Sequence, residues 1–137
     1  MLEDTAGAIQ AYERALELEP DSAFTLDNLI PLYEGKEDAA RLVELYRRRI
    51  ELCGEDDQGL KYQLLMDAAN RHELGLSDRR EAIHLLTDAL AVKPGDPEVM
   101  KRLDVLFTAE QMWPELLENM RQESAAATDV EAKRALH

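Results

Sequence analysis

"AGAIQAYERALELEP" (residues 6–20) decides the fold, because a related segment returns later in the same chain. The segment "AIHLLTDALAVKP" (82–94) aligns with "AIQAYERALELEP" (8–20) without a gap and shares two alanines, one isoleucine, one leucine and the proline with it. Tyr12 and Tyr46 lie 34 residues apart, as do Leu16 and Ile50. A fixed period of this length predicts an array of repeated units rather than one compact bundle.

The units are helical, because apolar residues recur at helical spacing in almost every segment and no stretch alternates with the period of a strand. Breaks fall at "EPDS" (19–22), "EGKED" (34–38), "CGEDDQG" (53–59), "LGLSD" (74–78), "KPGDP" (93–97) and "AEQMWP" (109–114). They divide the chain into helices of about 14 to 18 residues. Short connections place consecutive helices antiparallel, so the sequence predicts an all-α chain of helical hairpins laid side by side.

Three pairs of residues indicate where helices begin. Asp96 before Pro97 is a cap followed by proline at the first helical position, where a missing N–H costs nothing. Asp78 with Glu81, and Thr128 with Glu131, have the spacing of residues that cap each other's free backbone donors. We therefore expect helix starts near residues 78, 96 and 128.

The chain resembles the tetratricopeptide repeat (TPR) family, whose 34-residue helix-turn-helix unit has the pattern W-x2-L-G-x2-Y, then A-x3-F, then P. The second half of this pattern appears as Ala8, Tyr12 and Pro20; as Leu42, Tyr46 and Gly54; as Ala82, Leu86 and Pro94; and as Leu116, Met120 and Thr128. The first half appears as Leu26, Leu29, Ile30 and Tyr33, and as Met100, Leu103, Asp104 and Phe107. A third copy, Leu65, Ala68, Ala69 and His72, fits only with one extra residue before Ala82 and about five extra residues ahead of it.

The resemblance implies one α-solenoid domain over residues 1–137 that coils as a right-handed superhelix. Its units are a repeat tail (1–20), a repeat (21–54), a longer repeat (55–94), a repeat (95–128) and the start of the next (129–137). Since the first and last units are partial, we expect a fragment of a longer array that is truncated at both ends. The apolar faces of Ile9, Tyr12, Leu16, Val130 and Leu136 would then be exposed and promote self-association or fraying.

Charge and composition limit the partners. The 29 acidic and 16 basic residues give a formal charge of −13, which repels a phosphate backbone, so we expect no direct binding to nucleic acid. No apolar run approaches the roughly 20 residues of a membrane helix, and the N-terminal residues lack the order of a signal peptide. We expect a cytoplasmic protein without a membrane partner. The single Cys53 cannot form an internal disulfide, which fits a reducing compartment.

Few residues are candidates for catalysis. Glu81 and His84 have the Glu-x-x-His spacing of di-iron bundles, but no second copy exists, so we expect an exposed His84. His72 stands where the repeat pattern has an aromatic residue, which predicts packing between helices. Cys53 has acidic neighbours and lacks the positive charge of a reactive thiol. Without a nucleophile, base and oxyanion set or a Gly-rich phosphate loop, we expect no enzyme, no cofactor and no catalytic or metal-binding residue.

The segment "YRRRIEL" (46–52) has two interpretations. It is either a basic patch for an acidic partner or a solvated face crossed by ion pairs. Glu44 precedes Arg48 by four residues, and Arg47 precedes Glu51 by four, which favours the ion pairs.

Pro31 and Trp113 also have two interpretations each. Pro31 lies inside a helix that should start near Ser22, where proline removes the bond to the Asp27 carbonyl at a typical cost of ~3 kcal/mol. It is either a tolerated bend, which we favour, or a distorted groove wall that frees that carbonyl for a ligand. Trp113, the only tryptophan, either packs at an inter-helix turn, which we favour, or anchors an interface.

In TPR arrays the first helix of each hairpin lines a concave groove, and by resemblance this groove binds a peptide or protein. The partner-binding residues predicted at these positions are Phe24, Asp27, Pro31, Met66, Asn70, Lys101 and Val105. The carboxylate-binding clamp of chaperone-binding members is not carried over, because Asp27 stands where that clamp needs lysine. The sequence thus predicts a non-catalytic scaffold module; the alternatives are a regulatory domain that positions an enzymatic or signalling domain of the parent chain, and a helical metal enzyme.

Overall fold

The computed structural model describes residues 2–36 and 38–135, and the side chains of residues 4–36 and 38–127. The elements are α1 (Leu2–Leu18), α2 (Ala23–Glu34), α3 (Ala39–Glu51), the 3-10 helix η1 (Glu55–Asp57), α4 (Gln58–Asn70), the π-helix η2 (Arg71–Gly75), α5 (Arg79–Val92), α6 (Pro97–Ala109) and α7 (Trp113–Ala135). No strand occurs in these ranges, so the predicted all-α class is confirmed. None of the described helices is long and apolar enough to cross a membrane.

Two of the predicted helix starts carry a side-chain cap, but the reciprocal cap expected of Asp78 and Glu81 is only half formed, because the Asp78 N–H donates to the His72 carbonyl oxygen at 2.7 Å. At α2, the Ser22 hydroxyl accepts a hydrogen bond from the Thr25 N–H at 3.2 Å. At α5, the Asp78 carboxylate accepts one from the Glu81 N–H at 3.2 Å. Each bond satisfies one of the backbone donors that a helix leaves free in its first turn.

The start of α6 uses its capping residue differently. Pro97 is the first helical residue, as predicted, but Asp96 makes no side-chain cap. Its carboxylate instead accepts a hydrogen bond from the Tyr62 hydroxyl of α4. The Nζ of Lys93 lies 4.1 Å from the centroid of the same ring. Asp96 therefore ties the turn before α6 to α4.

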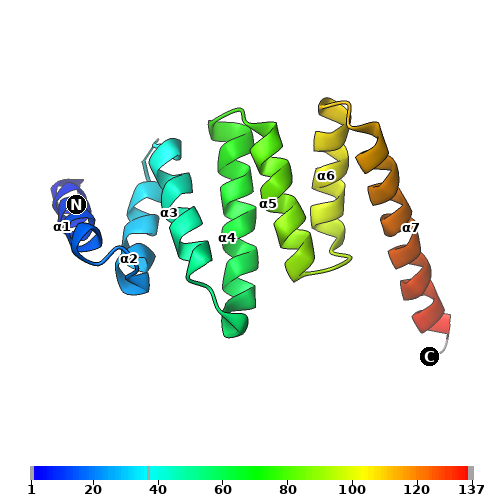
Figure 1. Ribbon diagram of the computed structural model, residues 1–137, viewed down its shortest axis with the longest axis horizontal. Coiled ribbons are helices and arrows are strands. Elements are labelled where there is room, and N and C mark those ends of the chain that lie inside the picture. The colour runs from blue at the N-terminus through cyan, green and yellow to red at the C-terminus, as the bar shows by residue number, and fades with distance from the viewer. Residues whose placement is uncertain (1, 37, 136–137) are drawn as a thin grey trace.

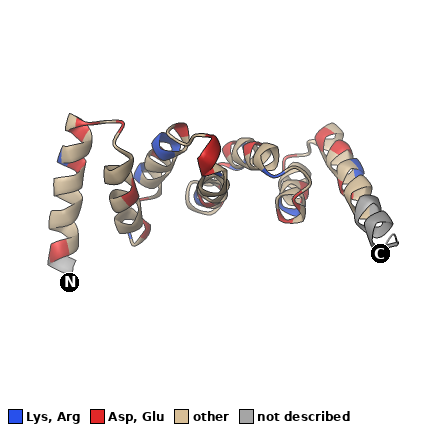
Figure 2. Ribbon diagram, turned by 90° about the horizontal axis from the view of Figure 1, so that it is seen from below, with Lys and Arg blue, Asp and Glu red and all other residues tan. Residues whose placement is uncertain are grey.

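The helices form one open row (Figure 1). Each α-helix packs on its neighbours in the chain, and non-consecutive α-helices do not approach each other closely along the described backbone. Figure 2 shows α4 and α6 on one side of the row and α3 and α5 on the other, and the terminal helices α1 and α7 turn toward the α4 and α6 side. We call the side of α2, α4 and α6 the inner face and the side of α3 and α5 the outer face.

The buried residues form two clusters that meet at α4. The first joins α1, α2 and α3 to Leu64 and Ala68 of α4. The second joins Leu65, Met66 and Ala69 of α4 to α5 and α6. Burial of apolar surface stabilises a fold by roughly 25 cal/mol per Å², so each half of the row depends on its own side of α4.

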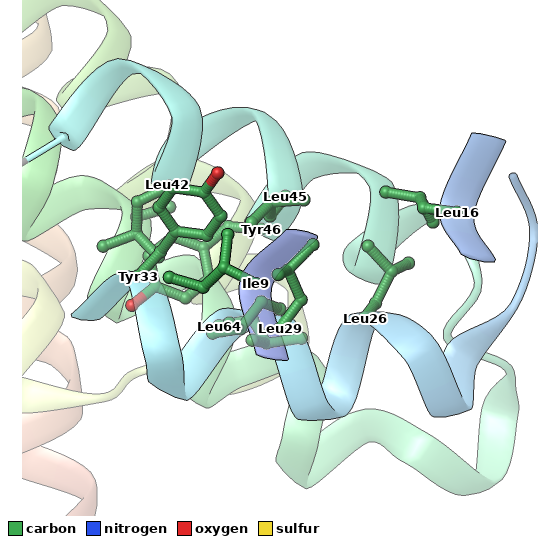
Figure 3. Packing of buried hydrophobic residues seen from close by; sticks show 11 residues of the cluster. Ile9, Leu16, Leu26, Leu29, Tyr33, Leu42, Leu45, Tyr46 and Leu64 are labelled. Carbon is green, nitrogen blue, oxygen red and sulfur yellow. The ribbon is translucent and has the colours of Figure 1, made fainter. Parts of the chain in front are cut away.

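The expectation that α1 presents an exposed apolar face is wrong for two of its three residues. Ile9 is 7% exposed and Leu16 is 2% exposed, while Tyr12 is half-buried. Figure 3 shows Ile9 and Leu16 beside the leucines of α2 and α3. They are buried because α2 packs directly on α1 and covers them. The side chains of Val130 and Leu136, the other part of that expectation, lie outside the described residues.

The irregular third repeat has a structural explanation. The one extra residue before Ala82 is accommodated by η2, because a π-turn holds one residue more than an α-turn of the same rise. The longer connection ahead of this repeat contains η1, which leads directly into α4. Gly75 ends the π-turn close to α3, where a Cβ on residue 75 would lie 3.0 Å from the Ala39 Cβ.

The helix start predicted at Thr128 is wrong, because α7 continues from Trp113 to Ala135 without a break. Residues 125–127 are alanines, the strongest helix formers, and no glycine or proline follows Pro114 within the helix. The spacing of Thr128 and Glu131 is therefore that of neighbours on one helix face. The expected repeat boundary between residues 128 and 129 does not coincide with an interruption of the helix.

Candidate functional site

Six of the seven predicted partner-binding residues are exposed on inner-face helices. Phe24 is 73% exposed and Val105 is 65% exposed. The other four are Asp27, Pro31, Asn70 and Lys101. Met66 is only 6% exposed and belongs to the second buried cluster. It is buried because α4 lies between both clusters and turns three consecutive residues, 64–66, into them.

A recess of about 590 Å³ opens between the C-terminal ends of α2 and α4, with residues of α3 and η2 along it. Its lining consists of Glu34, Lys36, Ala39, Tyr46, Asp67, Asn70, Arg71, Leu74 and Gly75. Glu34 of α2 and Asn70 of α4 bring the recess to the edge of the inner face, while Ala39 and Tyr46 of α3 also line it. Of the predicted residues only Asn70 lines it.

The carboxyl groups of this recess are held in place by neighbours. The hydroxyl of Tyr46 donates a hydrogen bond to Glu34 Oε2 at 2.7 Å. Burial, and then this bond, raise the pKa of Tyr46 well above its ordinary value, so it stays a neutral donor. Burial also raises the pKa of Asp67, although Gln63 donates to it at 3.0 Å. Both acids therefore face the recess as acceptors with defined positions.

The cations of the recess are less constrained. Neither Lys36 nor Arg71 has a carboxylate within 4.0 Å among the described residues. The amide of Asn70 accepts a hydrogen bond from Arg102 at 2.6 Å through its oxygen, so its NH2 group remains the part that can donate to a ligand. The recess thus combines free donors with fixed acceptors.

Sequence reasoning missed Lys36, Arg71 and the two acids. Lys36 stands in a predicted break and Arg71 directly follows a predicted residue, so both were visible as charged residues. Nothing in their spacing showed that the ends of α2 and α4 would line one recess, because that arrangement depends on how the hairpins pack.

Further bonds brace the inner face. Arg49 of α3, which is 8% exposed, donates from Nε to Asp27 Oδ1 at 2.7 Å. Arg102 of α6 bonds to Asn70 of α4 and lies 3.4 Å from Glu73. Arg49 joins the consecutive helices α2 and α3, whereas Arg102 joins α4 to α6 through its side chain, and the carboxylate of Asp27 is already engaged by Arg49.

Pro31 is exposed, and α2 continues through it to Glu34. The helix therefore accommodates the proline, which both interpretations of Pro31 allow. Trp113 is the first residue of α7 and is 54% exposed, so about half of its surface is free of packing.

The solvated interpretation of residues 46–52 is confirmed. Arg47 bonds to Glu44 at 2.5 Å and to Glu51 at 2.7 Å, and Arg48 lies 3.2 Å from Glu44. The remaining arginine, Arg49, was not singled out from the sequence and is the buried one.

Cys53 is a packed thiol beside the same arginine. Its Sγ lies 3.5 Å from the Arg49 carbonyl oxygen and 3.9 Å from Arg49 Nη1. Burial raises the pKa of the Cys53 thiol, while the Arg49 charge partly offsets that rise. A raised pKa disfavours the reactive thiolate, in line with the structural role expected for this residue.

Glu81 and His84 do not come together. Glu81 lines a hollow between α3 and α5, whereas the exposed His84 lines another between α5 and α7. In the part of the chain that the structure describes, no group of three or more His, Cys, Asp or Glu side chains could hold a metal ion.

A polar cluster joins α6 to α7. The buried Asn119 donates from Nδ2 to the Met100 carbonyl oxygen at 2.8 Å and to Asp104 Oδ1 at 2.7 Å. One turn later, Glu123 has a buried Oε1 without a hydrogen-bond partner among the described residues. The nearby Asp104 carboxylate, and then burial, raise the pKa of Glu123 to about 7, which the charge of Lys101 partly opposes.

Glu123 should therefore make stability depend on pH. A carboxyl group with a higher pKa in the folded chain stabilises the fold while protonated, and this contribution is lost as pH rises from the ordinary 4.5 through about 7. Because Glu123 keeps some solvent contact, we expect Glu123→Gln to gain about 1–2 kcal/mol relative to wild type between pH 5 and pH 8. Urea unfolding at both pH values measures this difference. Glu115→Gln, at an exposed position of α7, is the control; equal behaviour of the two variants would refute the assignment.

No known protein-family profile and no curated protein sequence matches the chain. Solved structures do match its fold. A mutant of MamA aligns with a TM-score of 0.61 and 17% identity over 86% of this chain and 65% of its own. A second MamA structure (MamA MSR-1 C2) gives 0.62 and 15% over 93% of this chain and 70% of its own. The N-terminal domain of stress-induced protein-1 from C. elegans gives 0.56 and 24% over 69% and 75%.

The fold is TPR-like. The helical hairpins predicted from the 34-residue period are thus confirmed as a TPR-like α-solenoid. This TPR-like array spans 65% of the length of the first MamA structure.

Proposed function

We propose that this TPR-like array is a non-catalytic protein-interaction module that binds an extended peptide segment of a partner protein along its inner face. The observation that carries the proposal is the recess of about 590 Å³ beside Arg71. It lies between two inner-face helices, where a peptide crossing from α2 to α4 would meet it.

The chemistry of the recess matches a peptide backbone. A peptide presents N–H donors and carbonyl acceptors in alternation. Asp67 and Glu34 can accept from the N–H groups, and Arg71 and Lys36 can donate to the carbonyl oxygens. The lining holds two acids and two cations, which favours a polar peptide over a strongly charged ligand.

One exposed apolar side chain stands on the rim of this polar centre, and another stands at the opposite end of α2. Leu74, on the rim of the recess, is 81% exposed, and Phe24 of α2 is 73% exposed. Large exposed side chains of this kind provide the contacts that dominate affinity once a partner covers them. The bonds from Arg49 to Asp27 and from Arg102 to Asn70 hold the helices in place, which lowers the cost of ordering the surface on binding.

Charge reversal at the centre of the recess tests this function. Peptides would be selected from a random displayed library against the whole chain, and their Kd measured by fluorescence anisotropy. We expect Arg71→Glu to weaken binding about tenfold, a loss of ~1.4 kcal/mol, because a third carboxylate repels the acceptors of the peptide.

The matched control is Arg121→Glu, which makes the same charge change on α7 at a side chain that is 71% exposed. Its Kd should equal that of wild type. The proposal fails if no peptide is enriched, or if the two variants bind the selected peptides equally well.

A further inference from the structure

The outer face carries a groove that the proposed function does not use. It lies between α3 and α5 and has a volume of about 370 Å³. The two helices do not approach each other along the described backbone, because α4 and η2 lie between them. In Figure 2, α3 and α5 stand on the outer face with α4 set back between them. We call this hollow the outer groove.

The floor of the outer groove is apolar. Val43 of α3, Leu65 of α4 and Leu85 of α5 line it. His72 lines it too, and its buried Nδ1 has no hydrogen-bond partner in the part of the chain that the structure describes. His72 thus packs between helices, as the sequence predicts, but it leaves one unsatisfied polar atom beside the floor.

Both walls of the outer groove are acidic. Glu44 and Glu51 stand on the α3 wall, and Glu81 and Asp88 on the α5 wall. The members of each pair are seven residues apart, which is about two turns or roughly 10 Å along one side of a helix. The spacing of negative charge is therefore the same on both walls.

The two walls differ in how their charges are compensated. Arg47 bonds to Glu44 at 2.5 Å and to Glu51 at 2.7 Å, so it serves both acids of the α3 wall. For Glu81 and Asp88, no lysine, arginine or histidine nitrogen lies within 4.0 Å among the described residues. With Arg47 as the one lining Arg or Lys against four acids, the groove keeps a net negative charge.

The hollow between α1 and α3 contains a carboxylate whose charge is compensated within the chain. There Glu13 accepts hydrogen bonds from Arg41 and, at 3.0 Å, from the Tyr33 hydroxyl. The Glu13 carboxylate is therefore already bound by residues of its own chain. The carboxylates of Glu81 and Asp88 are left for another molecule.

We propose that the outer groove binds an amphipathic helix of a partner protein whose apolar stripe is flanked by Lys or Arg residues two turns apart. Such a helix places apolar side chains on the floor and its cations against the acidic walls. Helices that dock in grooves use this arrangement of one apolar stripe with flanking charges. The binding surface is separate from the recess beside Arg71.

The test uses the whole chain and a fluorescein-labelled synthetic helix of about 18 residues, with one leucine stripe and flanking lysines. A scrambled peptide of the same composition controls for charge alone. We expect the amphipathic peptide to bind and to shift the backbone NMR signals of α3 and α5. Tighter binding of the scrambled peptide, or shifts confined to the inner face, would overturn the proposal.

Two matched double variants test whether the carboxylates of the α5 wall contribute to binding. Glu81→Gln with Asp88→Asn should weaken binding of the amphipathic peptide about fivefold, because two exposed ion pairs are lost. Glu55→Gln with Asp56→Asn removes the same charge from the exposed η1 and should leave the Kd unchanged. Equal weakening in both double variants would show a general attraction to an acidic protein and would refute the groove.

Discussion

Replacement of Leu65 by alanine is expected to lower the free energy of unfolding by about 2–5 kcal/mol. Leu65 is 1% exposed and lies in the second buried cluster. Its removal leaves a cavity between α4 and α5 that the surrounding helices fill only in part, so packing is lost along with burial. Urea unfolding followed by circular dichroism measures the change.

The control is Leu74→Ala, which removes the same atoms nine positions later from a side chain that is 81% exposed. Its effect should stay within about 0.5 kcal/mol. If both variants lost the same stability, the second cluster would not be the source of the stabilisation.

The second large effect is expected at Asn119, where alanine should lower the free energy of unfolding by about 2–3 kcal/mol. Asn119 is 5% exposed and its Nδ2 donates to the Met100 carbonyl oxygen and to Asp104. Without it, a backbone acceptor and a carboxylate at the α6 and α7 interface lose their donor. Unpaired polar groups at such sites cost more than the bond itself contributed.

Urea unfolding of Asn119→Ala would be compared with Gln122→Ala, which removes an exposed amide from the same helix. The Gln122 amide donates to Glu118 at 3.4 Å, and its loss should change stability by no more than about 0.5 kcal/mol. A loss below about 1 kcal/mol for Asn119→Ala would mean that solvent reaches the interface and replaces the bonds.

Features that depend on local chemistry could be predicted from the sequence. Ser22, Asp78 and Pro97 mark helix starts because each acts on its own first turn, and all three starts are where they were predicted. The 34-residue period predicted the TPR-like array because each hairpin buries its face on the next. Even the extra residue of the third repeat was visible, although only the structure shows that η2 accommodates it.

Features that depend on packing could not be predicted. Met66 follows the repeat pattern to the inner face but is buried, because α4 is shared by two clusters. Ile9 and Leu16 were predicted to be exposed but are buried. The spacing of residues in the sequence does not show that α2 packs over this side of α1. The recess is lined by the ends of α2 and α4, which lie 30 residues or more apart in the sequence. Of its lining residues, only Asn70 was predicted as a partner-binding residue.

The position of α4 between the two clusters has a mechanical consequence. Among the buried described residues, α4 alone contributes to both clusters. Tension applied to the two ends of the row would reach α4 from both sides, together with Ile50 of α3 and Leu85 of α5, which pack against both clusters. Each cluster would then unfold at its own force, so a pulled chain would lengthen in two steps. The weaker cluster would unfold first, while the other stayed folded.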